Sequence, residues 1–130
     1  MVEDRITDGR RIAELLSSDL DGREDGDLTR VAVTNADRDV EQTADGARAY
    51  DVTRDDDRIA RAFVQEDRAR LEFEAGQDAA AEAAAEVDLR VRPKATTPPR
   101  TLVFVESGAE VKRATDVVQA VSRRLEDGSA

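Results

Sequence analysis

Cysteine and histidine are both absent from the 130-residue chain. Their absence excludes disulfides, thiolate chemistry, a Ser-His-Asp triad, and zinc or iron sites of the usual nitrogen and sulfur kind. The single tyrosine, Tyr50, would need a large pKa shift to act as a base near neutral pH. Any catalysis must therefore use carboxylates, arginine, lysine or a bound hard metal ion.

Long apolar runs are missing as well. No stretch approaches the roughly 18 apolar residues of a membrane span, and residues 1–5 are acidic where a signal peptide would be basic and then apolar. We therefore expect a cytoplasmic protein that does not associate with a membrane. The length suits one hydrophobic core, so residues 1–130 are expected to form a single domain rather than a multidomain enzyme.

Lysine and bulky apolar residues are scarce. The chain has 18 Arg but 2 Lys, 18 Asp against 12 Glu, and 21 Ala and 14 Val against 8 Leu, 3 Ile and 3 Phe, with a net charge of -10. This composition is typical of a cytoplasmic protein from a halophile that keeps molar salt inside the cell; an ordinary acidic mesophile protein is the alternative. Because the core has few bulky side chains, we expect folding to be marginal in dilute buffer.

The spacing of apolar residues predicts the elements of the N-terminal half. A helix is expected over residues 4–20, and because glycine is costly inside a helix, Gly9 favours a later start capped by Thr7 or Asp8. A polar loop follows over 22–27. Period-two apolar positions then predict four strands, near 31–33, 50–52, 59–63 and 71–73, with the acidic run 55–57 as a hairpin tip.

The C-terminal half predicts two further helices and two further strands. In order, these are an alanine-rich helix over 77–86, a strand over 87–92 ended by Pro93, a proline-rich loop over 94–100, a strand over 101–106, and a helix over 111–125 stopped by Asp127-Gly128. The short connections between the early strands favour antiparallel hairpins. The predicted fold is α+β, with a mainly antiparallel sheet of about six strands and three helices covering one face, in the order α-β-β-β-β-α-β-β-α.

The segment Ser107-Gly108-Ala109-Glu110 matches a capping box at the start of the last helix. In such a box the Ser107 hydroxyl accepts a hydrogen bond from the Glu110 amide, and the Glu110 carboxylate accepts one from the Ser107 amide. Backbone amides at a helix start also form a generic anion site, so Ser107 and Gly108 are weak anion-binding candidates. Glu110 would compete with a phosphate for those amides.

Residues 33–40 and 92–108 resemble a small family of uncharacterised acidic proteins from halophilic archaea. The resemblance implies a halophilic habitat and a compact α+β domain. It transfers no functional residue.

Arginines on the predicted strands are the second group of candidates. Arg70, Arg90 and Arg92 alternate with apolar positions, so they should project from the sheet face opposite the core, where they could bind nucleic acid or an anionic metabolite. Against this interpretation, aromatic residues for base stacking are few, and Glu72, Glu74 and Asp88 share the same parity. A phosphate-driven interaction also weakens steeply as salt rises. A solvated face of paired charges is the alternative.

No metal or cofactor site is predicted. The spacing Asn35-x-Asp37-x-Asp39 is that of a calcium loop, but Val40 stands where the loop needs glycine and Gly46 where it needs a bidentate glutamate. We therefore interpret this segment as a turn between strands.

The two helix faces rich in small residues suggest self-association. Ala80 and Ala84 on one helix, and Val118 and Val121 on the other, would gain from burial against a second copy. The favoured function is thus a non-catalytic interaction module that forms a homodimer. Binding of nucleic acid or an anionic metabolite through the arginine-bearing strands is the alternative, and a carboxylate or metal-dependent enzyme comes third.

Overall fold

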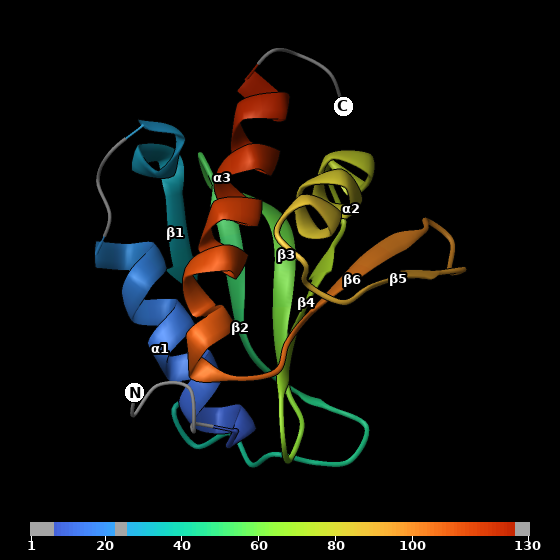
Figure 1. The fold of residues 1–130 in the computed structure, drawn as a ribbon. Helices are drawn as coiled ribbons and strands as arrows, with labels where there is room; N and C mark the ends of the chain where they lie inside the picture. Colours follow the sequence, from blue (N-terminus) through green and yellow to red (C-terminus); the bar gives the residue numbers. More distant parts are fainter. Residues whose placement is uncertain (1–6, 23–25, 127–130) are drawn as a thin grey trace.

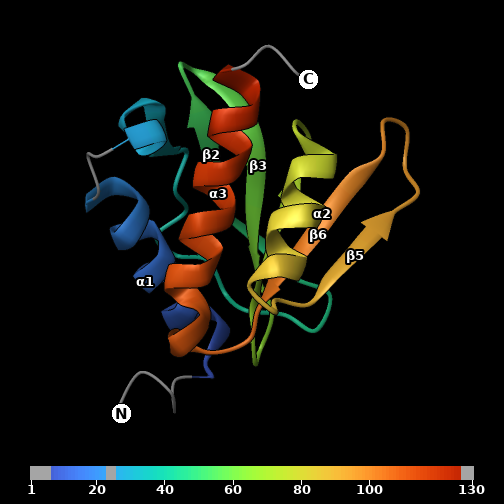
Figure 2. The same ribbon diagram turned by 45° about the horizontal axis from the view of Figure 1, so that its top comes forward.

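The computed structural model describes residues 7–22 and 26–126 of the chain. Within them, three helices lie side by side on one face of a six-stranded sheet (Figures 1 and 2). The helices are α1 (Gly9–Gly22), α2 (Gln77–Glu86) and α3 (Val111–Glu126), with short 3-10 helices η2 (Gly26–Arg30) and η3 (Gly108–Glu110). The strands are β1 (Val31–Thr34), β2 (Ala47–Arg54), β3 (Asp57–Val64), β4 (Ala69–Phe73), β5 (Val91–Lys94) and β6 (Arg100–Val105).

The strand order is β1-β2-β3-β4-β6-β5, and each pair of neighbouring strands is antiparallel. The predicted α+β class and the predicted order of elements are therefore confirmed.

No helix in residues 7–22 or 26–126 has both the length and the apolar character needed to cross a bilayer.

Helix α1 begins at Gly9, as the alternative start predicts. The Asp8 carboxylate accepts a hydrogen bond from the Arg10 amide at 3.0 Å, which caps the helix. Glycine is required at its first position, because a Cβ on Gly9 would lie 1.8 Å from the carbonyl oxygen of Gln65. The helix thus packs directly against the turn between β3 and β4. Residues 4–6 of the predicted helix, and the predicted stop at Asp127-Gly128, lie outside the described residues.

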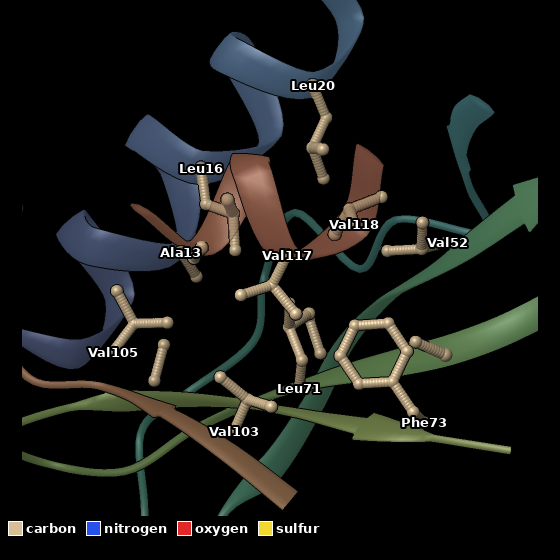
Figure 3. Close-up of a cluster of buried hydrophobic side chains, with 14 of the residues drawn as sticks. Ala13, Leu16, Leu20, Val52, Leu71, Phe73, Val103, Val105, Val117 and Val118 are labelled. Atoms are coloured by element: carbon tan, nitrogen blue, oxygen red, sulfur yellow. The ribbon is translucent and has the colours of Figure 1, made fainter. Parts of the chain in front are cut away.

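The hydrophobic core lies between the helices and the sheet, as Figure 3 shows for its centre. Leu71, Phe73 and Val103 project from the sheet toward Leu16 and Val117 on the helices, and all five are buried. Most of the remaining core positions are alanine or valine. Side chains this small let the helices approach the sheet closely, so a chain with few bulky residues can still bury a continuous core.

The helix faces with small side chains point into this core rather than toward a second copy of the chain. Ala80, Ala84, Val118 and Val121 are each 0% exposed in the single chain. The reason is that α2 packs against α3 and β6, which cover the alanine face that the sequence leaves unpartnered. The assignment of these four residues to a dimer face is therefore corrected.

The fifth strand is present, but it lies later in the chain than the predicted range 87–92. Asp88 turns the chain with a φ of 59°, and Leu89 is buried in the core rather than paired in a ladder. Strand β5 begins later, at Val91, and contains Pro93 instead of ending before it. A proline is tolerated there because β5 is an edge strand that pairs only with β6.

Two local predictions at chain reversals have different outcomes. The tip at Asp55 and Asp56 is a tight turn between β2 and β3 with φ values of 50° and 72°, as the predicted hairpin requires. The capping box is wrong in detail, because the Ser107 side chain makes no capping hydrogen bond. Instead the Glu110 carboxylate accepts a hydrogen bond from the Glu106 amide at 2.8 Å, and η3 precedes α3.

Candidate anion-binding face of the sheet

The sheet face opposite the helices, called here the open face, carries a row of alternating arginine and phenylalanine. Phe63 on β3 lies opposite Arg70 on β4, which lies opposite Phe104 on β6. Arg48 on β2 pairs with Phe63, and the Phe104 amide donates a hydrogen bond to the Arg90 carbonyl just before β5. The Arg-Phe row is therefore Arg48, Phe63, Arg70, Phe104 and Arg90, and it crosses the sheet from β2 to the start of β5.

The open face is cationic, although the chain as a whole is acidic. Its cationic side chains are Arg48, Arg58, Arg61, Arg68, Arg70, Arg90, Arg92, Lys94 and Arg100. Its carboxylates are Asp51, Asp67, Glu72, Glu74 and Glu106. The whole chain has a net charge of -10, so the excess negative charge lies entirely outside this face.

Glu72, at the centre of the open face, organises the surrounding cations. Its side chain is 1% exposed, and its carboxylate lies 2.9 Å from Arg70 Nε, 3.1 Å from Arg100 Nη1 and 3.7 Å from Lys94 Nζ. Burial by itself raises the pKa of Glu72, but the hydrogen bonds from Arg70 and Arg100 outweigh it and hold the pKa below its usual range. Glu72 is therefore ionised at neutral pH and fixes both guanidinium groups in place.

Arg70 is held on all sides. Its guanidinium carbon lies 4.7 Å from the centre of the Phe63 ring, a cation–π contact. Its Nη1 donates to the Asp45 carbonyl at 3.0 Å and to Gln65 Oε1 at 3.2 Å, in addition to the Nε bond to Glu72. The middle of the Arg-Phe row is thus rigid before any ligand binds.

A pocket of about 450 Å³ lies at the end of this row, beside the edge strand. It is lined by Gln65, Arg68, Arg90, Val91, Arg92 and Phe104. The Glu106 carboxylate pairs with Arg68 at 2.9 Å and with Arg90 at 3.3 Å. Arg92 is exposed and, among the described residues, no carboxylate pairs with it. Arg92 is therefore the cation of this face most available to a ligand, and it shares the pocket with the half-buried Phe104 ring.

A larger pocket of about 540 Å³ lies between α1, β1 and the loop that follows β1. Its charged lining residues are of both signs, and they include Arg10, Glu14 and Asp37. Tyr50 contributes no base here: burial raises its pKa, and its hydroxyl donates to the Ala13 carbonyl at 2.8 Å. The lining of this pocket therefore indicates neither an anion site nor a cation site.

The acidic loop after β1 is used for local turns. The Asp37 carboxylate accepts a hydrogen bond from the Asp39 amide at 3.0 Å, and Asn35 donates to Asp51 at 2.9 Å. In the described part of the chain, no group of three or more Asp or Glu side chains could hold a metal ion. The residues with calcium-like spacing therefore serve to hold this loop in place through hydrogen bonds.

The structure brings together one of the two predicted groups of anion-binding candidates. Arg90 and Arg92 line the same pocket, and Arg70 lies opposite Phe104 in the sheet. Ser107 and Gly108 belong elsewhere, since Gly108 is buried in a separate pocket of about 230 Å³ against α1 and α3.

Sequence reasoning missed the two phenylalanines. There Phe63 and Phe104 enter only as parts of the strands expected near 59–63 and over 101–106, whereas in the structure both lie half-buried on the open face. A signal was present, because each alternates with small core residues, Phe63 with Ala62 and Val64, and Phe104 with Val103 and Val105.

Comparison with known proteins identifies one relationship. The model of a family of unknown function, DUF7993, matches residues 1–130. No curated protein matches the chain, and no solved structure does.

Proposed function

This chain belongs to the DUF7993 family, whose function is unknown, and we propose that it is a non-catalytic module that binds an anionic ligand on its open face. The observation that carries the proposal is the separation of charge. Nine cationic side chains and five carboxylates lie on one face of a chain whose net charge is -10. A surface of one sign attracts ligands of the other sign and orients them as they approach.

The chemistry of the cations favours phosphate or carboxylate groups. Arginine presents a planar fork of donors that matches the oxygens of either group, and the open face uses arginine almost throughout. Most of these guanidiniums already have a carboxylate partner, so the pocket is the point of entry. There Arg92 has no carboxylate partner among the described residues, and Arg90 pairs with Glu106 at 3.3 Å. Arg68 is the most fully paired of the three, with Asp67 at 3.1 Å and Glu106 at 2.9 Å.

The alternatives have less support. Dimerisation through Ala80, Ala84, Val118 and Val121 is not proposed, because these residues lie inside the core. Catalysis by carboxylates needs two acidic groups that lie close together and whose pKa values differ, so that one acts as an acid and the other as a base. Within residues 7–22 and 26–126, the two buried carboxylates pair with cations instead, Asp51 with Arg48 at 3.4 Å and Glu72 with Arg70 at 2.9 Å.

We further propose that the protein works at high salt, as its composition suggests. At about 1 M salt the Debye length is about 3 Å, so long-range attraction to the open face is largely screened. Affinity at high salt would then come from direct contacts in the pocket around Arg92, and little of it from the long-range electrostatic attraction of the whole face.

The proposal is tested with long-chain inorganic polyphosphate as the probe, by isothermal titration calorimetry from 0.1 to 1 M KCl. We expect Arg90→Gln with Arg92→Gln to weaken binding by about tenfold or more, because each removes a charge-assisted contact. The matched control is Lys112→Gln with Arg113→Gln, two exposed cations on α3 at the other side of the molecule. If the wild-type protein does not bind, or if the control pair weakens binding equally, the open face is not the site.

A further inference from the structure

The placement of phenylalanine on the open face needs an explanation. The chain has three phenylalanines, and its core is otherwise built largely from alanine and valine, so bulky side chains would be most stabilising inside. Only Phe73 is there, fully buried. Phe63 and Phe104 are half-buried on the face without helices, in register with arginines on both sides.

A ligand that fits this surface must be both planar and anionic. A ring face accepts a flat π-system, and the neighbouring guanidiniums accept negative charge, so an aliphatic carboxylate or a bare polyphosphate would leave the rings unused. Nucleotides combine a planar base with a phosphate, and proteins bind unpaired bases by stacking them on aromatic rings or guanidinium planes. In the pocket, Phe104 and Arg92 supply one group for each part.

The extent of the row favours a polymer over a single nucleotide. Neighbouring strands lie about 4.8 Å apart, so the row from Arg48 to Arg90, across five strands, spans about 19 Å. That span exceeds the pocket and continues the cationic surface well beyond it. A mononucleotide would use the pocket alone and leave Arg48 and the Phe63–Arg70 pair without a role.

The spacing of the two rings selects single strands over duplexes. Phe63 and Phe104 are separated by β4, so they lie about 10 Å apart. Bases stacked on each other in a helix are spaced by about 3.4 Å. A base on the Phe104 ring and a base on the Arg70 guanidinium that covers Phe63 must therefore be splayed apart, which a single strand permits and a base-paired duplex does not.

We propose that the anionic ligand is a single-stranded nucleic acid, with one base stacked on Phe104 and its phosphates along Arg92 and the rest of the open face. This inference rests on the proposed anion-binding function and names its ligand. The second stacking position is the Phe63 ring with the Arg70 guanidinium that covers it.

The test is fluorescence anisotropy with a labelled ten-nucleotide single strand, competed by the matching duplex, by UMP and by inorganic polyphosphate. We expect the single strand to bind at least tenfold more tightly than the duplex or UMP. Phe104→Leu should weaken oligonucleotide binding by about tenfold or more and leave polyphosphate binding unchanged, because it removes the ring and keeps all charges. Phe104→Tyr is the matched control, since it keeps the ring and should retain binding.

A second readout does not depend on comparing affinities. The chain contains no tryptophan, so Phe104→Trp introduces a single reporter whose fluorescence a stacked base should quench when the strand is added. Thermal melts of each variant verify that it is folded.

The outcomes separate the two proposals. If polyphosphate and the single strand bind equally well, Phe104→Leu changes neither affinity, and the tryptophan is not quenched, the nucleic-acid inference is overturned while anion binding stands. Tighter binding of the duplex also overturns the inference. Binding of neither probe overturns both.

Discussion

The two faces of the sheet are built on opposite principles. The face under the helices uses small apolar side chains, such as Ala60, Ala62 and Val103, that bring the layers close together. The open face uses long charged side chains around Glu72 and two half-buried rings. Strand alternation places both patterns on the same strands, because successive side chains point to opposite faces.

The two faces are also shielded from water in different ways. The covered face reaches full burial with alanine and valine, because three helices provide cover. The open face has no cover, and its central carboxylate is nevertheless 1% exposed. There the stems of arginine and lysine provide the cover, since these side chains shield neighbours while their charged ends reach water. The comparison predicts that the same change will have very different effects on the two faces.

The largest effect is expected from a charge on the covered side. Val118→Asp should unfold the protein or reduce its free energy of unfolding by several kcal/mol, because an unpaired carboxylate would be buried between α3 and the sheet. Gln119→Asp is the control, one residue away on the same helix and only half-buried. Circular dichroism melts measure both variants. An unchanged melting temperature for Val118→Asp would contradict the arrangement of the helical layer.

Removal of a ring compares the two faces directly. Phe73→Ala leaves a cavity in the core and should cost about 3–5 kcal/mol. Phe104→Ala removes a half-exposed ring and should cost about 1 kcal/mol. Urea unfolding of the two variants gives the difference. Equal losses would mean that Phe104 is a core residue, and its assignment to a binding surface would fail.

Neutralisation of Glu72 tests the centre of the open face. Glu72→Gln should cost about 2 kcal/mol at pH 7, less than for a fully buried pair because Arg100 and Lys94 are partly exposed. Glu82→Gln, which alters the exposed pair with Arg124, should change stability by less than about 0.5 kcal/mol.

The same variant predicts a pH dependence. The folded-state pKa of Glu72 is lowered, so its contribution is fully present above the unfolded value of about 4.3 and is lost as the pH falls through the folded value. The wild-type protein should therefore lose more stability than Glu72→Gln between pH 6 and pH 3. Urea unfolding at each pH measures this loss. An equal loss of unfolding free energy in the wild-type protein and Glu72→Gln would show that the cations do not stabilise the ionised carboxylate.

The smallest effect is expected from salt, which acts on the charge outside the open face. Raising KCl from 0.05 to 3 M should raise the melting temperature by several degrees, because screening reduces repulsion among the excess carboxylates and added salt strengthens apolar burial. Circular dichroism melts across the series check this. A falling midpoint would mean that attraction within the charged network of the open face outweighs repulsion elsewhere.

The sequence alone predicts the elements whose patterns are local. The period-two strands from β1 to β4, the alanine-rich α2 and the apolar stripe of α3 all follow from side-chain spacing, which depends only on the backbone repeat. The turn at Asp55 and Asp56 follows from its composition. The anion-binding candidates Arg70, Arg90 and Arg92 likewise follow from strand parity.

The tertiary structure decided which of these patterns meet. Pro93 can lie in a strand because β5 is at the sheet edge, and Ala80 and Val121 are internal because α2 and α3 pack together, facts that no local spacing contains. The Arg-Phe row exists because β6 inserts between β4 and β5, which places Phe104 opposite Arg70, 34 positions earlier in the chain. Side-chain alternation determines which residues of a strand share a face. Long-range packing determines which face the helices cover, and the strand order determines the neighbours of each residue.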